Sequence, residues 1–421
     1  MMNQWKKSVG LGLICLFGWS LSVYAVAYST AAGDTKNIRF YRAPSKNFTL
    51  VQPSGKDIRN IILCIGDGMG LNQIAMARQK AVGSGGKLWM EMLPVAGLVR
   101  TYSADHAVTD SAAAATAMAC GIKTNNGTLG IGVDGISYAT ILELFAKRGY
   151  RTGLIATSTI THATPAGFAS HVLSRGSEEQ IAEQMFNHRI DVLFGGGRKY
   201  WLPAGTSEGA RSDTQNLLEL ARRQGYCIVE TRAQLDALTY GPVIGLFAAD
   251  ALTTFEPEPS PAQMTEKAIT LLDCKSTDWF VPEPKFFLMV EGSQIDWAGH
   301  ENDTDNSIRQ TLLFDMAVRE AVEFARHDRR TLVIVTADHE TGGLLLMKEK
   351  LNVKKTDPDW NTKDHTGVDV PLFAFGPGAK EFTGVMDNTE IPRKIADLLE
   401  IENFPRAVTG DEIELPRGTR R

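Results

Sequence analysis

The sequence is poor in cysteine, in long apolar segments and in excess positive charge, and each shortage excludes a class of protein. Five cysteines in 421 residues are too few for a disulfide scaffold. Beyond the first 27 residues no apolar run is long enough to cross a membrane, so no stable membrane anchor is expected there. With 44 basic residues against 49 acidic ones, the chain lacks the charge of a nucleic-acid-binding surface.

The N-terminal segment has the pattern of a secretory signal peptide. Lys6 and Lys7 precede an apolar run over residues 9–26, and small residues that suit cleavage lie within 23–27. We therefore predict that residues 1–27 direct the protein to the periplasm or out of the cell; an uncleaved N-terminal anchor is the alternative. Cleavage would remove two lysines and leave 42 basic residues against 49 acidic ones, a net charge of −7.

Four cysteines remain after this segment, and an exported protein can form a disulfide. Cys64 and Cys120 lie in apolar segments and are expected to be buried thiols. This leaves Cys227 and Cys274 as the candidate pair for one disulfide bond.

Apolar strands alternate with helical patterns along most of the chain. Strands are expected at residues 59–66, 95–101, 151–156, 191–194, 226–229, 285–290, 331–336 and 370–375. Helices are expected at residues 71–82, 137–147, 177–186, 214–224, 261–272, 305–326 and 389–399. This alternation predicts an α/β fold: a three-layer sandwich with a mostly parallel central sheet and helices on both faces.

We predict one catalytic domain over residues 28–421. A chain of this length with 43% hydrophobic residues can bury a large core. The segments near 195–212 and 344–363 interrupt the alternation and are expected to be short surface insertions.

A run of alanines after Asp110 and Ser111 predicts a narrow helix with a polar first turn. Either Asp110 or Ser111 can cap this helix, and Gly121 is placed to end it. The N-terminus of such a helix carries partial positive charge and free N–H groups, which suit a phosphate group. The Ser111 hydroxyl would then lie beside the bound anion; a plain capping role is the alternative.

Three carboxylates end or follow apolar strands, namely Asp67, Glu291 and Asp338. Because the carboxyl ends of parallel strands meet at one edge of a sheet, we expect these side chains to converge there. Burying several carboxylates together is costly unless cations meet them. The sequence therefore predicts metal binding at this edge.

Histidines accompany the carboxylates. Asp296 and His300 are four residues apart. His339 follows Asp338 directly, and His365 precedes another strand. Mixed nitrogen and oxygen ligands suit Zn²⁺, whereas ligand sets of oxygen alone suit Mg²⁺.

The chain resembles the alkaline phosphatase family in seven segments, which together are specific although each alone is weak. They are Ile65-Gly66-Asp67-Gly68-Met69-Gly70, Thr109-Asp110-Ser111-Ala112-Ala113, His162-Ala163-Thr164-Pro165, Ser174-Arg175, residues 291–300, Thr336-Ala337-Asp338-His339-Glu340 and His365-Thr366-Gly367. The resemblance spans about residues 59–375 and implies the hydrolysis of small phosphate monoesters.

The resemblance also implies the roles of individual residues. Ser111 would be the nucleophile that becomes a phosphoserine, and Arg175 would hold the phosphate oxygens. The implied ligands are, for a first zinc, Asp296, His300 and His365; for a second zinc, Asp67, Asp338, His339 and Ser111; and for a third metal, usually magnesium, Asp67, Thr164 and Glu291.

Two residues beside these ligands depart from the best-known bacterial pattern. His162 stands where that pattern often has aspartate, and Trp297 stands where it has lysine. Both occur in other family members, so activity is still expected. A homodimer is compatible with the resemblance, but the segment 344–363 is short for the family's crown, so we do not expect dimerisation through a large crown.

Other functions on the same fold are less well matched. A phosphodiesterase or nucleotide pyrophosphatase, the main alternative, usually has threonine as its nucleophile, whereas this chain has Ser111. A sulfatase needs a cysteine or serine in a motif with proline and arginine, which is absent here. A non-catalytic phosphate- or metal-binding protein would be favoured by the loss of the nucleophile or of a zinc ligand, and none is missing.

Overall fold

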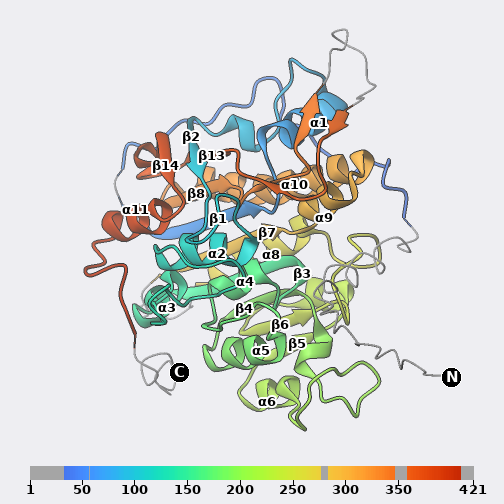
Figure 1. Ribbon diagram of the computed structural model, residues 1–421, viewed down its shortest axis with the longest axis vertical. Helices are drawn as coiled ribbons and strands as arrows, with labels where there is room; N and C mark the ends of the chain where they lie inside the picture. Colours follow the sequence, from blue (N-terminus) through green and yellow to red (C-terminus); the bar gives the residue numbers. More distant parts are fainter. Residues whose placement is uncertain (1–32, 56, 276–282, 347–357, 409–421) are drawn as a thin grey trace, which may run out of the picture. The chain divides into compact units, whose positions relative to one another are not determined.

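One ten-stranded sheet organises the fold (Figure 1). The computed structural model describes residues 33–55, 57–275, 283–346 and 358–408, so the predicted signal peptide lies outside the described residues. Along the sheet the strand order is β14-β2-β13-β8-β1-β7-β3-β4-β6-β5. The neighbouring pairs are parallel except those that β13 makes with β8 and β2. The predicted α/β fold with a mostly parallel sheet is confirmed.

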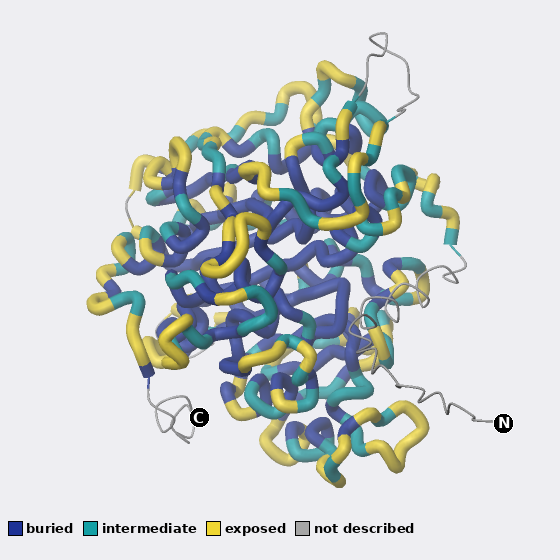
Figure 2. Tube along the Cα trace, viewed as in Figure 1, coloured by how far each residue is buried: buried dark blue, intermediate teal, exposed yellow. Residues whose placement is uncertain are grey.

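The strands are short and most of them are buried. In chain order, the sheet contains β1 (Asn60–Gly66), β2 (Val95–Arg100), β3 (Arg151–Thr159), β4 (Val192–Gly196), β5 (Cys227–Val229), β6 (Val243–Leu246), β7 (Phe286–Gly292), β8 (Thr331–Thr336), β13 (Val370–Phe375) and β14 (Gly384–Asp387). Two small antiparallel pairs are separate from it: β9 (Glu340–Thr341) with β12 (His365–Thr366), and β10 (Leu344–Leu346) with β11 (Pro358–Trp360). Every residue of β1, β7 and β8 is buried (Figure 2), as their continuous apolar sequences require.

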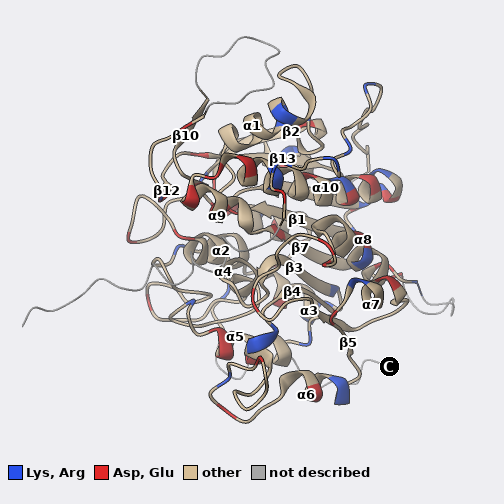
Figure 3. Cartoon of the chain, turned by 90° about the vertical axis from the view of Figure 1, so that its right-hand side faces the viewer, with Lys and Arg blue, Asp and Glu red and all other residues tan. Residues whose placement is uncertain are grey.

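Helices cover both faces of the sheet. They are α1 (Leu71–Val82), α2 (Ser111–Cys120), α3 (Ile141–Lys147), α4 (Ala163–Gly167), α5 (Glu178–Asn187), α6 (Leu217–Arg223), α7 (Arg232–Ala237), α8 (Pro261–Leu272), α9 (Gln294–Glu301), α10 (Thr304–Asp328) and α11 (Glu390–Leu398). Helices α8 and α10 lie on one face, and α2 and α4 lie on the other (Figure 3). Among the described residues, no helix combines the length and apolarity needed to cross a membrane.

Helix α3 begins later than the sequence pattern predicted. Its N-cap is Thr140, three residues after the start expected at Ser137. The Thr140 hydroxyl accepts a bond of 3.1 Å from the Glu143 N–H, and the Glu143 carboxylate accepts one of 2.8 Å from the Thr140 N–H. This capping box outcompetes Ser137, which instead pairs with Ile131 in an isolated β-bridge.

The two segments expected as surface insertions contain ordered structure. Within 195–212, Trp201 and Arg211 are buried, and the Arg211 guanidinium donates to the Tyr200 and Glu179 carbonyls. Of the segment 344–363, β10 and β11 are described, and residues 347–357 lie outside the described residues.

The predicted disulfide between Cys227 and Cys274 is wrong, because both are free thiols. Cys227 begins β5 at the edge of the sheet. The Cys274 carbonyl accepts a bond of 2.8 Å from Arg151, at the start of β3. Three strand spacings separate β3 from β5, roughly 14 Å, whereas the Cα atoms of a disulfide lie within about 7 Å of each other.

Candidate active site

Three adjacent strands bring the predicted carboxylates to one edge of the sheet. Strand β1 lies between β7 and β8, with Ile65 opposite Glu291 on one side and Thr336 on the other. Asp67 follows β1, and Asp338 follows β8 after one residue. Asp67, Glu291 and Asp338 are all buried there.

The first ligand cluster joins α9 to β12. Asp296 and His300 lie one helical turn apart on α9, with His300 Nε2 3.3 Å from Asp296 Oδ2. His365 Nε2 lies 3.4 Å from Asp296 Oδ1 and 3.2 Å from His300 Nε2. Burial alone would raise the pKa of Asp296, but its hydrogen bonds with the two histidines hold that pKa well below its ordinary value.

Asp67, Asp338 and His339 form the second cluster, next to Ser111. His339 Nε2 lies 3.2 Å from Asp338 Oδ2 and 3.5 Å from Asp67 Oδ1. The Ser111 hydroxyl is 3.4 Å from the same nitrogen. Burial lowers the pKa of His339 well below its ordinary value, so the ring is neutral and Nε2 can act as a ligand atom.

A third cluster contains Asp67, Glu291 and His162, whose ligand atoms lie within 4.8 Å of one another. Thr164, on the short helix α4, has a buried hydroxyl that has no hydrogen-bond partner among the described residues. The structure thus adds His162 to Asp67 and Glu291, two of the three ligands that the resemblance implies for the third metal.

The histidines of the first two clusters are oriented by their other ring nitrogen. Nδ1 of His365 lies 2.9 Å from the Thr109 carbonyl, and Nδ1 of His300 contacts the Lys363 carbonyl. Nδ1 of His339 lies 3.3 Å from the Thr341 hydroxyl. Each contact leaves Nε2 facing the carboxylates, as in protein metal sites.

The closeness of these groups depends on a glycine in the turn after β1. Gly68 has a φ of +71°, and a Cβ on it would lie 2.7 Å from the Asp296 Cα atom. A larger residue would push α9 away from Asp67.

Metal ions fit the donor set of these clusters. Both oxygens of Asp67, Oε1 of Glu291 and Oδ2 of Asp338 are buried and accept no hydrogen bond from the described residues. Burial, reinforced by neighbouring carboxylates, raises the pKa of Asp67 well above its ordinary value, that of Glu291 to about 7 and that of Asp338 to about 6. Cations would satisfy these oxygens and favour their charged forms.

Ser111 is the first residue of α2, and Asp110 is its N-cap. Asp110 Oδ1 accepts a bond of 2.9 Å from the Ala113 N–H, and Gly121 ends the helix with a φ of +70°. The second oxygen of Asp110 accepts a bond of 3.0 Å from Arg175 Nη1. Asp110 therefore caps α2 and also holds Arg175, and the sequence pattern indicated only the cap.

Arg175 and Trp297 both lie against His162. Arg175 Nη2 is 3.1 Å from His162 Nε2, and the Trp297 ring stands edge-on to the imidazole at a centroid distance of 5.8 Å. Burial and the Arg175 charge lower the pKa of His162 to about 3, so this histidine is neutral. Ser111 thus contacts the predicted ligand His339, and His162 contacts both Arg175 and Trp297.

Sequence reasoning missed Thr341, whose hydroxyl contacts both Asp296 and His339. It also missed the Thr109 and Lys363 carbonyls, because a backbone oxygen leaves no trace in residue type. The pairing of β9 with β12, which places Thr341 opposite His365, is too short to show a pattern.

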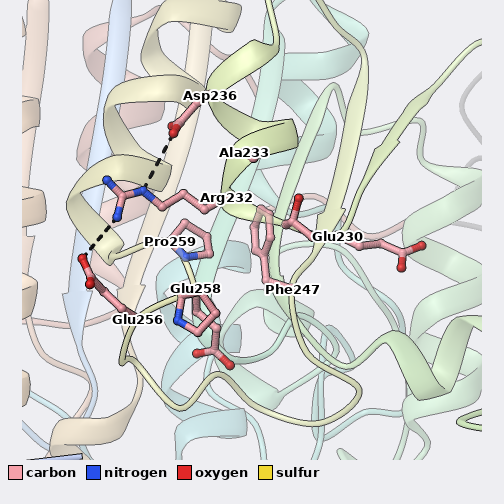
Figure 4. Close-up of a pocket in the computed structure, with 10 residues that line it drawn as sticks. Glu230, Arg232, Ala233, Asp236, Phe247, Glu256, Glu258 and Pro259 are labelled. Atoms are coloured by element: carbon pink, nitrogen blue, oxygen red, sulfur yellow. Dashed lines mark hydrogen bonds and ion pairs between the residues drawn. The ribbon is translucent and has the colours of Figure 1, made fainter.

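A separate pocket of about 550 Å³ lies elsewhere, around Arg232 (Figure 4). Arg232 is paired with Asp236 at 3.8 Å and Glu256 at 3.4 Å. Glu230 and Glu258 also line the pocket. Four carboxylates against one engaged guanidinium make it unsuitable for a phosphate ester.

The strand-end clusters are typical of one class of protein, the hydrolases that act on phosphate esters with the help of bound metal ions. A sequence model of alkaline phosphatases matches residues 58–352 and 345–401 of this chain. Alkaline phosphatase 3 of Bacillus subtilis (strain 168) is 34% identical over 432 residues, covering 82% of this chain and 89% of that protein. Streptomycin-6-phosphate phosphatase of Streptomyces griseus is 35% identical over 415 residues, covering 83% and 92%.

Solved structures agree. Alkaline phosphatase from the Antarctic bacterium TAB5 matches with a TM-score of 0.73 and 36% identity, covering 84% of this chain and 99% of that one. The chain belongs to the alkaline phosphatase family. It is a phosphomonoesterase, and the phosphodiesterase alternative is not favoured.

Proposed function

We propose that this enzyme is a periplasmic or secreted alkaline phosphatase that hydrolyses small phosphate monoesters through a phosphoserine at Ser111. The observation that carries the proposal is the place of the Ser111 hydroxyl, at the N-terminus of α2 and 3.4 Å from His339 Nε2. A phosphate group at this hydroxyl would have the positive end of the α2 dipole on one side and a ligand cluster on the other. The signal peptide predicted from the sequence of residues 1–27 supports the compartment.

We propose two zinc ions and one magnesium ion as the cofactors. The clusters of Asp296, His300 and His365 and of Asp67, Asp338 and His339 offer mixed nitrogen and oxygen ligands, which suit zinc. Asp67, Glu291 and Thr164 offer oxygens, which suit magnesium. A histidine-to-aspartate mutant of the TAB5 enzyme has a structure with magnesium bound. When bound, such ions lower the pKa of a coordinated hydroxyl or water and stabilise developing negative charge.

Ser111, Arg175 and Asp110 have separate roles in the proposed reaction. The Ser111 oxygen attacks phosphorus in line with the ester bond, so a serine–phosphorus bond forms while the bond to the alcohol oxygen breaks. Water then attacks the phosphoserine from the side that the alcohol left, so the bond between the Ser111 oxygen and phosphorus breaks, the serine hydroxyl is restored and inorganic phosphate is released. Arg175 binds two phosphate oxygens with its two Nη atoms, and Asp110 orients it.

Substitution of Ser111 by alanine tests this proposal. Alanine is small and favours helix, so α2 should persist. We expect turnover of a phosphate monoester to fall by several orders of magnitude, and acid-quenched enzyme to lose its covalent label from radioactive phosphate. The exposed Ser54, changed to alanine, is the matched control. Near-normal turnover in Ser111→Ala with unchanged metal content would exclude Ser111 as the nucleophile.

The substrate class is tested on the wild-type enzyme. Hydrolysis of a phosphate monoester should exceed that of a phosphate diester and a sulfate ester by orders of magnitude. Partners beyond small monoesters, including a second copy of the chain, stay a prediction that the mass in solution can check.

A further inference from the structure

Arg175 lies in an irregular segment whose backbone is attached to a neighbouring loop. The Arg175 N–H donates to the Gly127 carbonyl at 2.8 Å. Leu129 and Val172 exchange two backbone hydrogen bonds, of 2.9 and 3.0 Å. The position of the guanidinium therefore depends on how firmly these two segments are held together.

His171 is buried at this junction and joins three elements. Its Nε2 lies 2.9 Å from Glu143 Oε1 on α3, and its Nδ1 lies 3.0 Å from the Gly130 carbonyl oxygen. Its backbone N–H donates to Gln184 Oε1 on α5 at 2.7 Å. The ring comes this close because residue 130 is a glycine: a Cβ there would lie 2.5 Å from Nδ1.

Both ring nitrogens of His171 face oxygens that only accept hydrogen bonds. A neutral imidazole has one N–H and satisfies one of them, whereas an imidazolium satisfies both. Burial opposes the charge, but Glu143 raises the pKa of His171 above its ordinary value. Two further groups face the pair: His188, with Nε2 3.3 Å from Glu143 Oε1, and Lys147, whose charge opposes protonation of His171.

We propose that His171 is a positioning residue for Arg175: its doubly protonated ring, held by Glu143, fixes the Gly130 carbonyl and so the junction from which Arg175 reaches the phosphate. This inference rests on the proposed role of Arg175. The junction is firm while His171 carries both protons and loosens as the pH rises through the pKa of His171. Loosening weakens the binding of substrate and of inorganic phosphate.

Two substitutions of His171 separate its two bonds. In His171→Asn the amide nitrogen takes the place of Nδ1 and keeps the bond to Gly130. In His171→Gln the amide nitrogen takes the place of Nε2 and keeps the bond to Glu143. We expect His171→Gln to raise KM and the inhibition constant of inorganic phosphate about fivefold, the effect of one lost hydrogen bond. His171→Asn should leave both constants near their wild-type values.

The matched control is His188→Gln. His188 also contacts the Glu143 carboxylate, but among the described residues it makes no hydrogen bond to residues 127–130. This substitution should leave the phosphate inhibition constant unchanged. Thermal unfolding and metal content of each variant show whether a changed constant reflects a damaged fold.

Glu143→Gln tests the role of the proton. Glutamine can keep the capping box of α3, but it removes the charge that favours protonated His171. We expect the phosphate inhibition constant to begin rising at a lower pH than in the wild type. The pH dependence of His171→Asn should lack this rise.

Arg175→Ala distinguishes the ways in which the inference can fail. An unchanged phosphate inhibition constant in Arg175→Ala would mean that the proposed role of Arg175 is wrong. A raised constant in Arg175→Ala, with equal constants in His171→Gln and His171→Asn, would overturn the role of His171 alone. If neither His171 variant folds, the Glu143→Gln profile decides: a shift supports the inference, and an unchanged profile overturns it.

Discussion

Replacing Trp297 by lysine should tighten inhibition by inorganic phosphate, because it adds a positive charge beside the bound dianion. Trp297 is half-buried on α9 and lies against His162, which in turn contacts Arg175. The indole supplies bulk and an N–H donor at this point, but no charge. A lysine there would face the same phosphate that Arg175 is proposed to bind.

The size of the effect follows from Coulomb's law. An ammonium roughly 6 Å from the phosphate would gain about 3 kcal/mol per unit of phosphate charge at an effective dielectric near 20, or about 5.5 kcal/mol for a dianion. Solvent access and repulsion from Arg175 reduce this value. We expect a net gain of about 1 kcal/mol, or about fivefold in the phosphate inhibition constant. Turnover should slow as well if product release limits it.

The assay measures the phosphate inhibition constant of the wild type, Trp297→Lys and Trp297→Met at several ionic strengths. Methionine removes the indole without adding charge, so it is the matched control. The gain in Trp297→Lys should shrink as salt screens the charge. An unchanged or weaker inhibition in Trp297→Lys with metals still bound, or an equal gain in Trp297→Met, would refute the electrostatic reasoning.

Two further predictions concern the metal clusters. His162→Asp should raise the affinity for magnesium about tenfold or more, because a carboxylate replaces a neutral imidazole beside Asp67 and Glu291. Calorimetric titration of zinc-loaded protein with magnesium measures this affinity. An unchanged affinity would contradict the prediction. With the metals removed by a chelator, the unfolding temperature should fall by several degrees as the pH rises from about 5 to about 7. Burial raises the pKa of Glu291 to about 7 and that of Asp338 to about 6, above the values in the unfolded chain. Over this pH range the folded protein must therefore ionise both carboxyls while they are buried, which destabilises it. Metal-loaded protein should lack this fall, and a flat profile in chelator would argue against the raised pKa values.

The central strands and the carboxylates at their ends could be predicted from sequence because burial on both faces leaves a continuous apolar run. Strand β8 has the predicted bounds, with four apolar residues between Thr331 and Thr336. The same reasoning placed Asp67 and Asp338 at one edge, since parallel neighbours end together. Strand β6 could not be predicted in this way, because it is only four residues long and its residue pattern does not stand out from the loops around it.

What could not be predicted was mostly interaction between distant segments. Nothing in the residue pattern shows that Asp110, besides capping α2, accepts from Arg175, 65 positions later. Nor does spacing show that His171 lies between Glu143 and Gly130. Such contacts depend on how loops pack, which local periodicity does not encode.

The charges of the site also bear on the order in which metal ions and phosphate bind. Asp67, Asp110, Glu291, Asp296 and Asp338 lie together with one guanidinium, that of Arg175. When these groups are ionised their net charge is −4, and a proton on His365, whose pKa burial would lower but Asp296 raises to about 9, makes the site −3, which still repels a phosphate dianion. The three divalent cations that we propose would displace that proton and give a net charge of +2, which attracts the dianion. Arg175 fits the same order, because its positive charge is already paired with the Asp110 carboxylate. If the proposed metal sites and the proposed role of Arg175 are right, metal ions bind before phosphate, and Arg175 holds phosphate on a site that cations have made positive.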